Sequence, residues 1–205
     1  MLVINDVSII HFLDTKDLES EYPIRLNPGH VLFEKTGVEL VSLNKNKSDL
    51  QHVPCDLCLQ AISDHLDMPG FLEDGELPLS HIIKINSSTE LDALFKVQIP
   101  HGANMVLSRQ KWKIILKEFL NNKWIVVSDV EGHGIENFIT ESNHVSFETD
   151  HFSTFAVVGY CDKNSFSAFK RMKVTAFCSE TGVGEDLVVR LYCFDDCECS
   201  FEVSF

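Results

Sequence analysis

A histidine and a serine stand two residues apart where an apolar run of the chain begins. The stretch reads "DHFSTFAVVGY" (residues 150–160), so that His151, Phe152 and Ser153 come just before the apolar residues. A serine hydroxyl is a weak nucleophile until a base takes its proton, and histidine is the side chain that titrates nearest neutral pH. The spacing therefore indicates nucleophilic chemistry at Ser153.

The nearest electrophile is the carbonyl carbon of Phe152, which is already bonded to the nitrogen of Ser153. Attack would give an ester by an N-to-O acyl shift, and water would then hydrolyse that ester. A planar trans amide resists this attack. We expect "ETD", just before His151, to form a bend that stores strain. About 1–5 kcal/mol of strain lowers a barrier by roughly one to four powers of ten. A base and an oxyanion donor are still required.

Three histidines are candidates for the base. His151 shares the face of the serine if the segment is extended. His133 lies in the glycine-flanked "EGHGIE", where Glu131 and Glu136 are available to orient it. His144 precedes the predicted bend. The residues alone leave the choice open.

Charge and hydropathy limit the partners. The chain of 205 residues carries 31 acids against 17 bases, a net charge of −14, which disfavours nucleic acid and anionic membranes. No stretch approaches the roughly 20 apolar residues of a membrane span. The N-terminal "MLVINDVSIIHFLDTKDLE" has an acid at Asp6 and no basic lead, unlike a secretory signal. We expect a cytoplasmic protein with protein partners and no membrane insertion.

The seven cysteines suit reduced thiols in the absence of a secretory signal. Cys55 and Cys58 have the spacing of a metal knuckle in "PCDLC". In a strand, however, they would face opposite sides, whereas zinc ligands converge. The sequence predicts no metal and no other cofactor.

The dominant period is two, which predicts strands. "LNNK" (120–123) signals a turn between two of them. Trp112 and Trp124, one on each side of that turn, are expected to be cross-strand core partners and not a base-stacking platform. The fold class is therefore all-β, an antiparallel β-sandwich. The predicted strands are 37–43, 56–63, 81–85, 90–100, 111–119, 123–130, 144–147 and 155–160.

A second, smaller β unit is predicted after residue 160. A polar linker is followed by alternating segments at 171–178 and 186–194, joined by the glycine-containing "SETGVGE". This pattern predicts a hairpin. Two strands cannot bury a core by themselves.

The order of segments resembles the ZU-five domain shared by zonula occludens proteins, netrin dependence receptors, ankyrins and the death-domain protein PIDD. The segments are "FEKTGVELV", then "PCDLCLQAISDHLDMPGFLEDGELPLSHIIKI", then "LFKVQIPHGA", then "HFSTFAVVG". "RMKVTAFC…DLVVRLYCFDD" resembles the start of the UPA domain that follows ZU-five in those proteins. The family's "I-P-P-G-A" turn is absent here. The resemblance implies an N-terminal strand or extension at 1–27, a ZU-five-like domain at 28–160 and a partial UPA domain at 165–205.

The resemblance also implies an activity, because PIDD and the related function-to-find domain of inflammasome-forming sensors cut themselves before the serine of a matching motif. It implies autoproteolysis between Phe152 and Ser153, with the fragments staying associated and no external substrate. Self-cleaving relatives are thought to use an upstream histidine assisted by an acid. The resemblance thus favours His133 with Glu131 or Glu136, whereas the two-residue spacing favours His151. We keep His151 and His133 as equal alternatives, with His144 third.

Signalling in apoptosis or an inflammasome-like pathway is the corresponding expectation, with death-domain-type signalling proteins or cytoskeletal adaptors as partners. The alternative is an interaction module that never cleaves, like the ZU-five domains of ankyrins and netrin receptors. A further alternative is that the C-terminal strands add to the sheet edge of a partner.

Overall fold

The computed structural model contains strands and turns, and no helix is among its described elements. The structure describes residues 20–27, 29–43, 54, 56–62, 68, 70–88, 94–105, 112–129, 138–161, 169–178 and 189–195. The strands are β1 (Ile24–Asn27), β2 (His30–Phe33), β3 (Val38–Ser42), β4 (Cys58–Ile62), β5 (Glu76–Pro78), β6 (Ile82–Asn86), β7 (Phe95–Pro100), β8 (Trp112–Leu120), β9 (Lys123–Asp129), β10 (Ile139–Thr140), β11 (His144–Thr149), β12 (Thr154–Cys161), β13 (Met172–Cys178) and β14 (Val189–Asp195).

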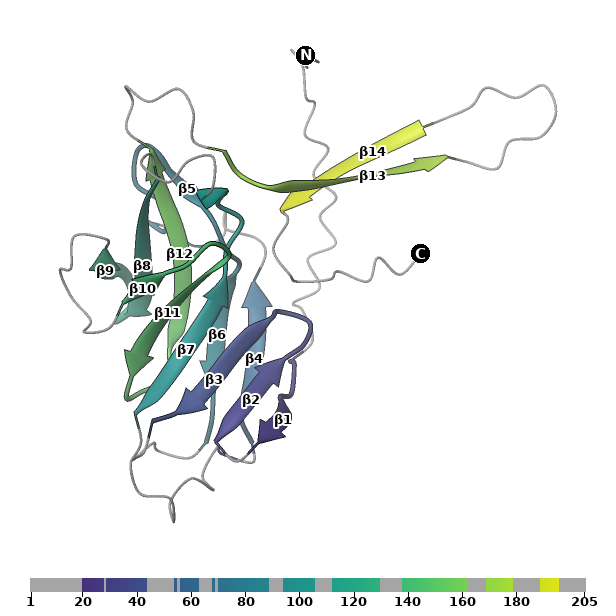
Figure 1. The fold of residues 1–205 in the computed structure, drawn as a ribbon. Helices are drawn as coiled ribbons and strands as arrows, with labels where there is room; N and C mark the ends of the chain where they lie inside the picture. Colours follow the sequence, from purple (N-terminus) through teal and green to yellow (C-terminus); the bar gives the residue numbers. More distant parts are fainter. Residues whose placement is uncertain are drawn as a thin grey trace.

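Two antiparallel sheets form a sandwich, as predicted (Figure 1). The first sheet has the strand order β1-β2-β3-β7-β11-β10. The second has the order β4-β6-β12-β8-β9, with the short β5 pairing to β12. β1 lies in the segment assigned to the N-terminal extension and is hydrogen-bonded to β2 in the first sheet.

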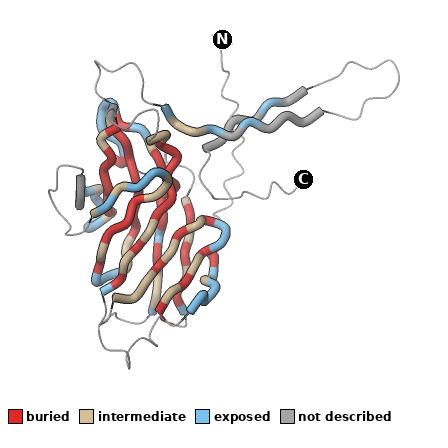
Figure 2. Tube along the Cα trace, viewed as in Figure 1, coloured by how far each residue is buried: buried red, intermediate tan, exposed pale blue. Residues whose placement is uncertain are grey.

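The main core lies between the sheets and follows the alternation of the sequence. Phe95, Val97 and Ile99 of β7 are all buried, as their period of two predicts. Phe155 and Val157 of β12 face this core from the second sheet. The red tube in Figure 2 shows that the buried residues concentrate in the sandwich.

β12 is buried on both faces. Its other face carries Ala156 and Val158, which pack with Phe71 and Ile115 in a second apolar cluster. Lys117, one of the fully buried side chains of β8, donates to the carbonyl of Phe71 and pairs with Glu76. The segment around Phe71 thus covers the outer face of the second sheet. The apolar run of β12 is continuous because neither face meets water.

The β8–β9 hairpin has the turn that the sequence predicted. Asn121 and Asn122 have φ values of 51° and 59°, and asparagine is enriched in this left-handed region. The two tryptophans are not partners of each other. Trp124 lies opposite Phe119 beside the turn, whereas Trp112 lies at the far end of β8 in the main core.

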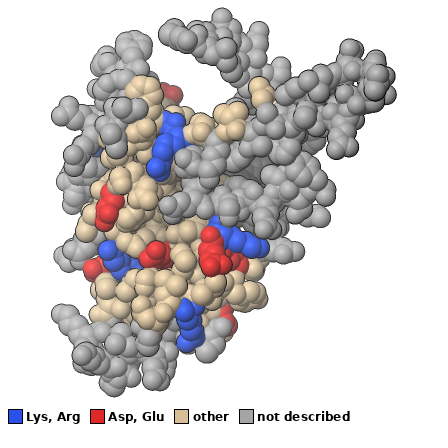
Figure 3. All heavy atoms as spheres, turned by 45° about the vertical axis from the view of Figure 1, so that its right-hand side comes forward, with Lys and Arg blue, Asp and Glu red and all other residues tan. Residues whose placement is uncertain are grey.

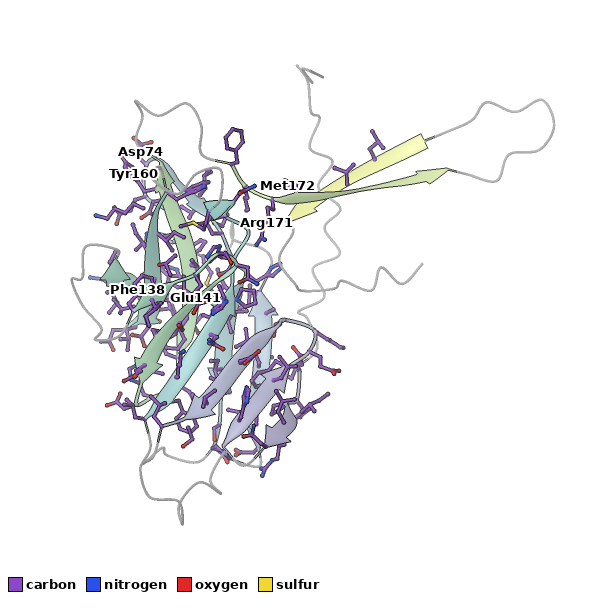
Figure 4. The ribbon with its side chains drawn as sticks, viewed as in Figure 1. Asp74, Phe138, Glu141, Tyr160, Arg171 and Met172 are labelled. Atoms are coloured by element: carbon purple, nitrogen blue, oxygen red, sulfur yellow. The ribbon has the colours of Figure 1, made fainter. Side chains whose placement is uncertain are left out.

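β13 and β14 form a two-stranded hairpin that projects from the sandwich (Figure 1). The residues that lead into the hairpin, 169–171, are hydrogen-bonded to residues 101–104 of the sandwich. The backbone nitrogen of Arg171 donates to the Gly102 carbonyl at 2.7 Å, and its guanidinium donates to the His101 carbonyl at 2.7 Å. Figure 4 labels Arg171 and Met172 at the root of β13. The base of the hairpin is therefore fixed to residues that precede β12 in the chain.

Candidate functional site

The connection from β11 to β12 carries the chain from the first sheet to the second. β11 ends at Thr149 and β12 begins at Thr154, so His151, Phe152 and Ser153 lie in the crossover and not in a strand. A bend is present at residues 150–151, so of the predicted "ETD" bend only Asp150 lies in it, and Glu148 and Thr149 belong to β11. The extended geometry that would place His151 and Ser153 on one face is therefore absent.

The Thr149 hydroxyl fixes the shape of the bend. It donates to the His151 carbonyl at 2.9 Å and accepts from the His151 backbone nitrogen at 3.3 Å. One buried side chain thus satisfies both backbone polar groups of His151, which β pairing leaves unbonded here. The positive φ values found in the described chain belong to Asn121, Asn122 and glycines, so the bend holds no left-handed backbone strain. The strain that we expected this bend to store is therefore not present as left-handed backbone conformation.

Phe152 and Ser153 make contacts in different parts of the sandwich: Phe152 with the main core, and Ser153 with strands of the second sheet. The Phe152 ring packs against the main core, with its centroid 5.5 Å from that of Phe95. The Ser153 hydroxyl donates to the Phe119 carbonyl of β8 at 3.4 Å, and the Ser153 carbonyl accepts from the backbone nitrogen of Ile85 at 3.0 Å. The bond between the two residues is therefore anchored on both sides.

His151 lies between two carboxylates. Its Nε2 is 2.8 Å from Oε1 of Glu118 and its Nδ1 is 2.8 Å from Oδ1 of Asp150. These hydrogen bonds, Asp150 first and Glu118 next, raise the pKa of His151, while partial burial opposes them. The hydrogen bond from His151 in turn lowers the pKa of Asp150. Because both nitrogens face acceptors, the arrangement favours the protonated ring, and the ring must be neutral before it can act as a base.

Glu118 was not predicted as a site residue. Its side chain is only 4% exposed, and it lies opposite Phe155 in the pairing of β8 with β12. Antiparallel partners share a face, so Glu118 points the same way as the core residues Ile114 and Leu116 of its own strand. A carboxylate buried at an apolar position costs several kcal/mol unless it is paired. The sequence did contain a signal for this residue. In "KWKIILKEF" the alternation calls for an apolar residue at position 118, and an acid stands there.

Three predicted site residues lie outside the described residues. These are Glu131, His133 and Glu136, and their roles stay predictions. β9, the described strand before these residues, ends at Asp129. Asp129 and Val158 are at the same level of the sheet, because both pair with Ile115 of β8. Val158 is five residues along β12 from Ser153, roughly 17 Å at the rise of a strand.

His144 lies at the other end of β11 from the bend. Five residue steps, or roughly 17 Å, separate it from Thr149. It pairs with Glu141 at 3.5 Å and contacts Asn143 and Gln98. His144 is therefore far along β11 from the Phe152–Ser153 bond, whereas His151 is the residue that precedes this bond.

Metal-binding and membrane-spanning features are absent from the described ranges. No group of three or more histidine, cysteine, aspartate or glutamate side chains in these ranges could hold a metal ion. Cys58 of β4 is a free thiol, and Cys55 lies outside the described residues. None of the described segments is a helix long and apolar enough to cross a membrane.

The fold and site define an antiparallel β-sandwich with a histidine–carboxylate cluster at the crossover between its sheets. Neither the protein-family models nor the curated proteins contain a match to this chain.

Proposed function

We propose that the chain is a signalling or scaffold module of the ZU-five–UPA type that cleaves itself between Phe152 and Ser153. The observation that carries the proposal is the ion pair between His151 and the buried Glu118, at the crossover that holds the Phe152–Ser153 bond. The order of segments that resembles the family supports it as well.

The chemistry balances without any cofactor. Neutral His151 takes the hydroxyl proton of Ser153 while the Ser153 hydroxyl oxygen bonds to the carbonyl carbon of Phe152. The carbon–nitrogen bond then breaks and the nitrogen receives that proton, which completes the acyl shift. Water hydrolyses the ester to a Phe152 carboxylate and a free Ser153 hydroxyl. The described residues place no hydrogen-bond donor on the Phe152 carbonyl, so we expect a slow reaction. Each chain can react only once, because the bond that is cut is its own.

The fragments stay together because cleavage leaves the sheet intact. β12 pairs with β8 along its full length on one side and with β5 and β6 on the other. Phe155, Val157 and Val158 are fully buried, and burial of each such side chain is worth about 1.5–3 kcal/mol. The C-terminal fragment is also held through Arg171. Release then requires unfolding of the N-terminal part.

Denaturing mass spectrometry of the purified full chain tests the proposal. We expect two fragments that divide the 23.2 kDa chain after Phe152, which elute together on native gel filtration. Ser153→Ala is expected to give one intact chain with the same fold. Ser42→Ala, at the end of β3, is the matched control and should cleave normally. An intact wild-type chain, or cleavage of Ser153→Ala, overturns the proposal.

An interaction module that never cleaves is the second candidate, and the hairpin favours it. Met172, Val174 and Leu191 are 48%, 62% and 66% exposed. Their register places them on one face of β13–β14. A protein partner of the signalling or cytoskeletal-adaptor kind would cover this face in the cytoplasm. On the face of the molecule shown in Figure 3, acids and bases are interspersed. The same mass spectrum would then show one uncut chain.

A further inference from the structure

Glu118 and Asp150 hold His151 in very different ways. Glu118 belongs to a central strand and its side chain is 4% exposed, whereas that of Asp150 is 82% exposed at the bend. Water competes with the Asp150 contact and hardly reaches the Glu118 contact. Nδ1 faces Asp150 at 2.8 Å and the Thr149 hydroxyl at 3.4 Å. It is therefore the ring nitrogen that is easier to vacate.

We infer that these two carboxylates regulate the proposed cleavage in opposite directions: Glu118 orients His151 for the reaction, and Asp150 blocks the nitrogen that must accept the Ser153 proton. The inference rests on the proposed function. Glu118 is a positioning residue, since it acts through the imidazole. It stabilises the imidazolium that forms when the ring takes a proton, as the buried acid of a serine–histidine–acid triad does.

The charge state of the ring gives the pH dependence. The charged groups that act on the His151 ring are Glu118 from β8 and Asp150 from the bend itself. Both raise its pKa, and a charged ring cannot accept a proton. The cleavage rate should therefore rise with pH through the pKa of His151.

Two matched substitutions distinguish the roles of the two carboxylates. Asp150→Asn replaces the carboxylate on Nδ1 with a neutral amide, which holds that nitrogen less tightly and no longer favours the charged ring. The pH midpoint of cleavage should fall and the rate at pH 7 should increase about two- to fivefold, the factor that an exposed ion pair contributes. Glu118→Gln should also lower the midpoint, but it should slow cleavage at least about tenfold at every pH, because the imidazolium loses its buried counter-charge.

Pulse-labelled cell-free translation of the full chain provides uncut protein, whose cleavage is followed on denaturing gels after a jump to a series of pH values. Glu148→Gln removes a nearby acid of β11 that faces Lys96 and should change neither rate nor midpoint. Slower cleavage of Asp150→Asn, or an unshifted midpoint in Glu118→Gln, overturns the inference. A structural role of Glu118 alone would lower the folded fraction and leave the midpoint in place.

Nuclear magnetic resonance titration of His151 in the uncut Ser153→Ala chain separates this inference from the proposed function. Both substitutions, made in that background, should lower the His151 pKa. If the wild-type chain never cleaves, the proposed function and the blocking role of Asp150 both fail. Unchanged pKa values in both variants would instead overturn the assignment of Glu118 and Asp150, whether or not the wild type cleaves.

Discussion

The neutral, buried His101 should make the stability of this protein fall in mild acid. His101 is fully buried at the joint between the sandwich and the hairpin. Its Nε2 lies 3.2 Å from the Glu141 carbonyl, and its Nδ1 has no partner among the described residues. A proton on Nδ1 would therefore be buried without an acceptor. Burial, with the nearby charge of Arg171 adding to it, lowers the pKa of His101 from 6.5 to about 4.

The size of the effect follows from linkage. The folded state binds a proton at His101 less readily than the unfolded state, so stability is present above pH 6.5 and is lost as the pH falls towards 4. Below pH 6.5 each further pH unit removes about 1.4 kcal/mol, which gives a loss of about 2 kcal/mol between pH 7 and pH 5. The pKa of His151 is raised and not lowered, so its stabilisation is present at low pH and is lost as the pH rises through that raised pKa.

Urea denaturation of the uncut Ser153→Ala chain at pH 7 and pH 5, with and without His101→Gln, measures this loss. We expect His101→Gln to be less stable at pH 7, because it replaces a packed ring, but to lose about 2 kcal/mol less on going to pH 5. The contribution of His151 is common to both chains and cancels in the difference. An equal loss in both chains would refute the argument.

Substitutions at three further places in the fold test its packing and backbone conformation by urea denaturation in the same background. Gly159→Ala places a Cβ 2.6 Å from both Leu79 and Trp112, and overpacking of this kind should cost about 1–3 kcal/mol. Lys117→Met should cost about 3–5 kcal/mol because it leaves Glu76 buried without its cation, and adding Glu76→Leu should recover most of that loss. Asn122→Val, which puts a β-branched residue at a φ of 59°, should destabilise the β8–β9 hairpin, whereas Asn122→Gly should not.

Local pattern was enough to predict the sandwich and most of its strands. The alternation of β7, the unbroken apolar run of β12 and the asparagine pair between β8 and β9 each report a local requirement: a half-buried strand, a strand buried on both faces, and a turn with positive φ. β2, β5 and β10 were not predicted, and β1 was predicted only as part of an N-terminal strand or extension at 1–27. They have two to four residues each, too few to show a period.

The sequence alone also singled out His151, Phe152 and Ser153, because the types and spacing of residues that could react are properties of adjacent positions. The partner of His151 could not be found in this way. Glu118 is 33 residues away in the chain. It reaches the imidazole because β8 pairs with β12 in a register that sets it beside the crossover. That register depends on how both strands bury their apolar faces, which is a property of the assembled sheets and not of either strand alone.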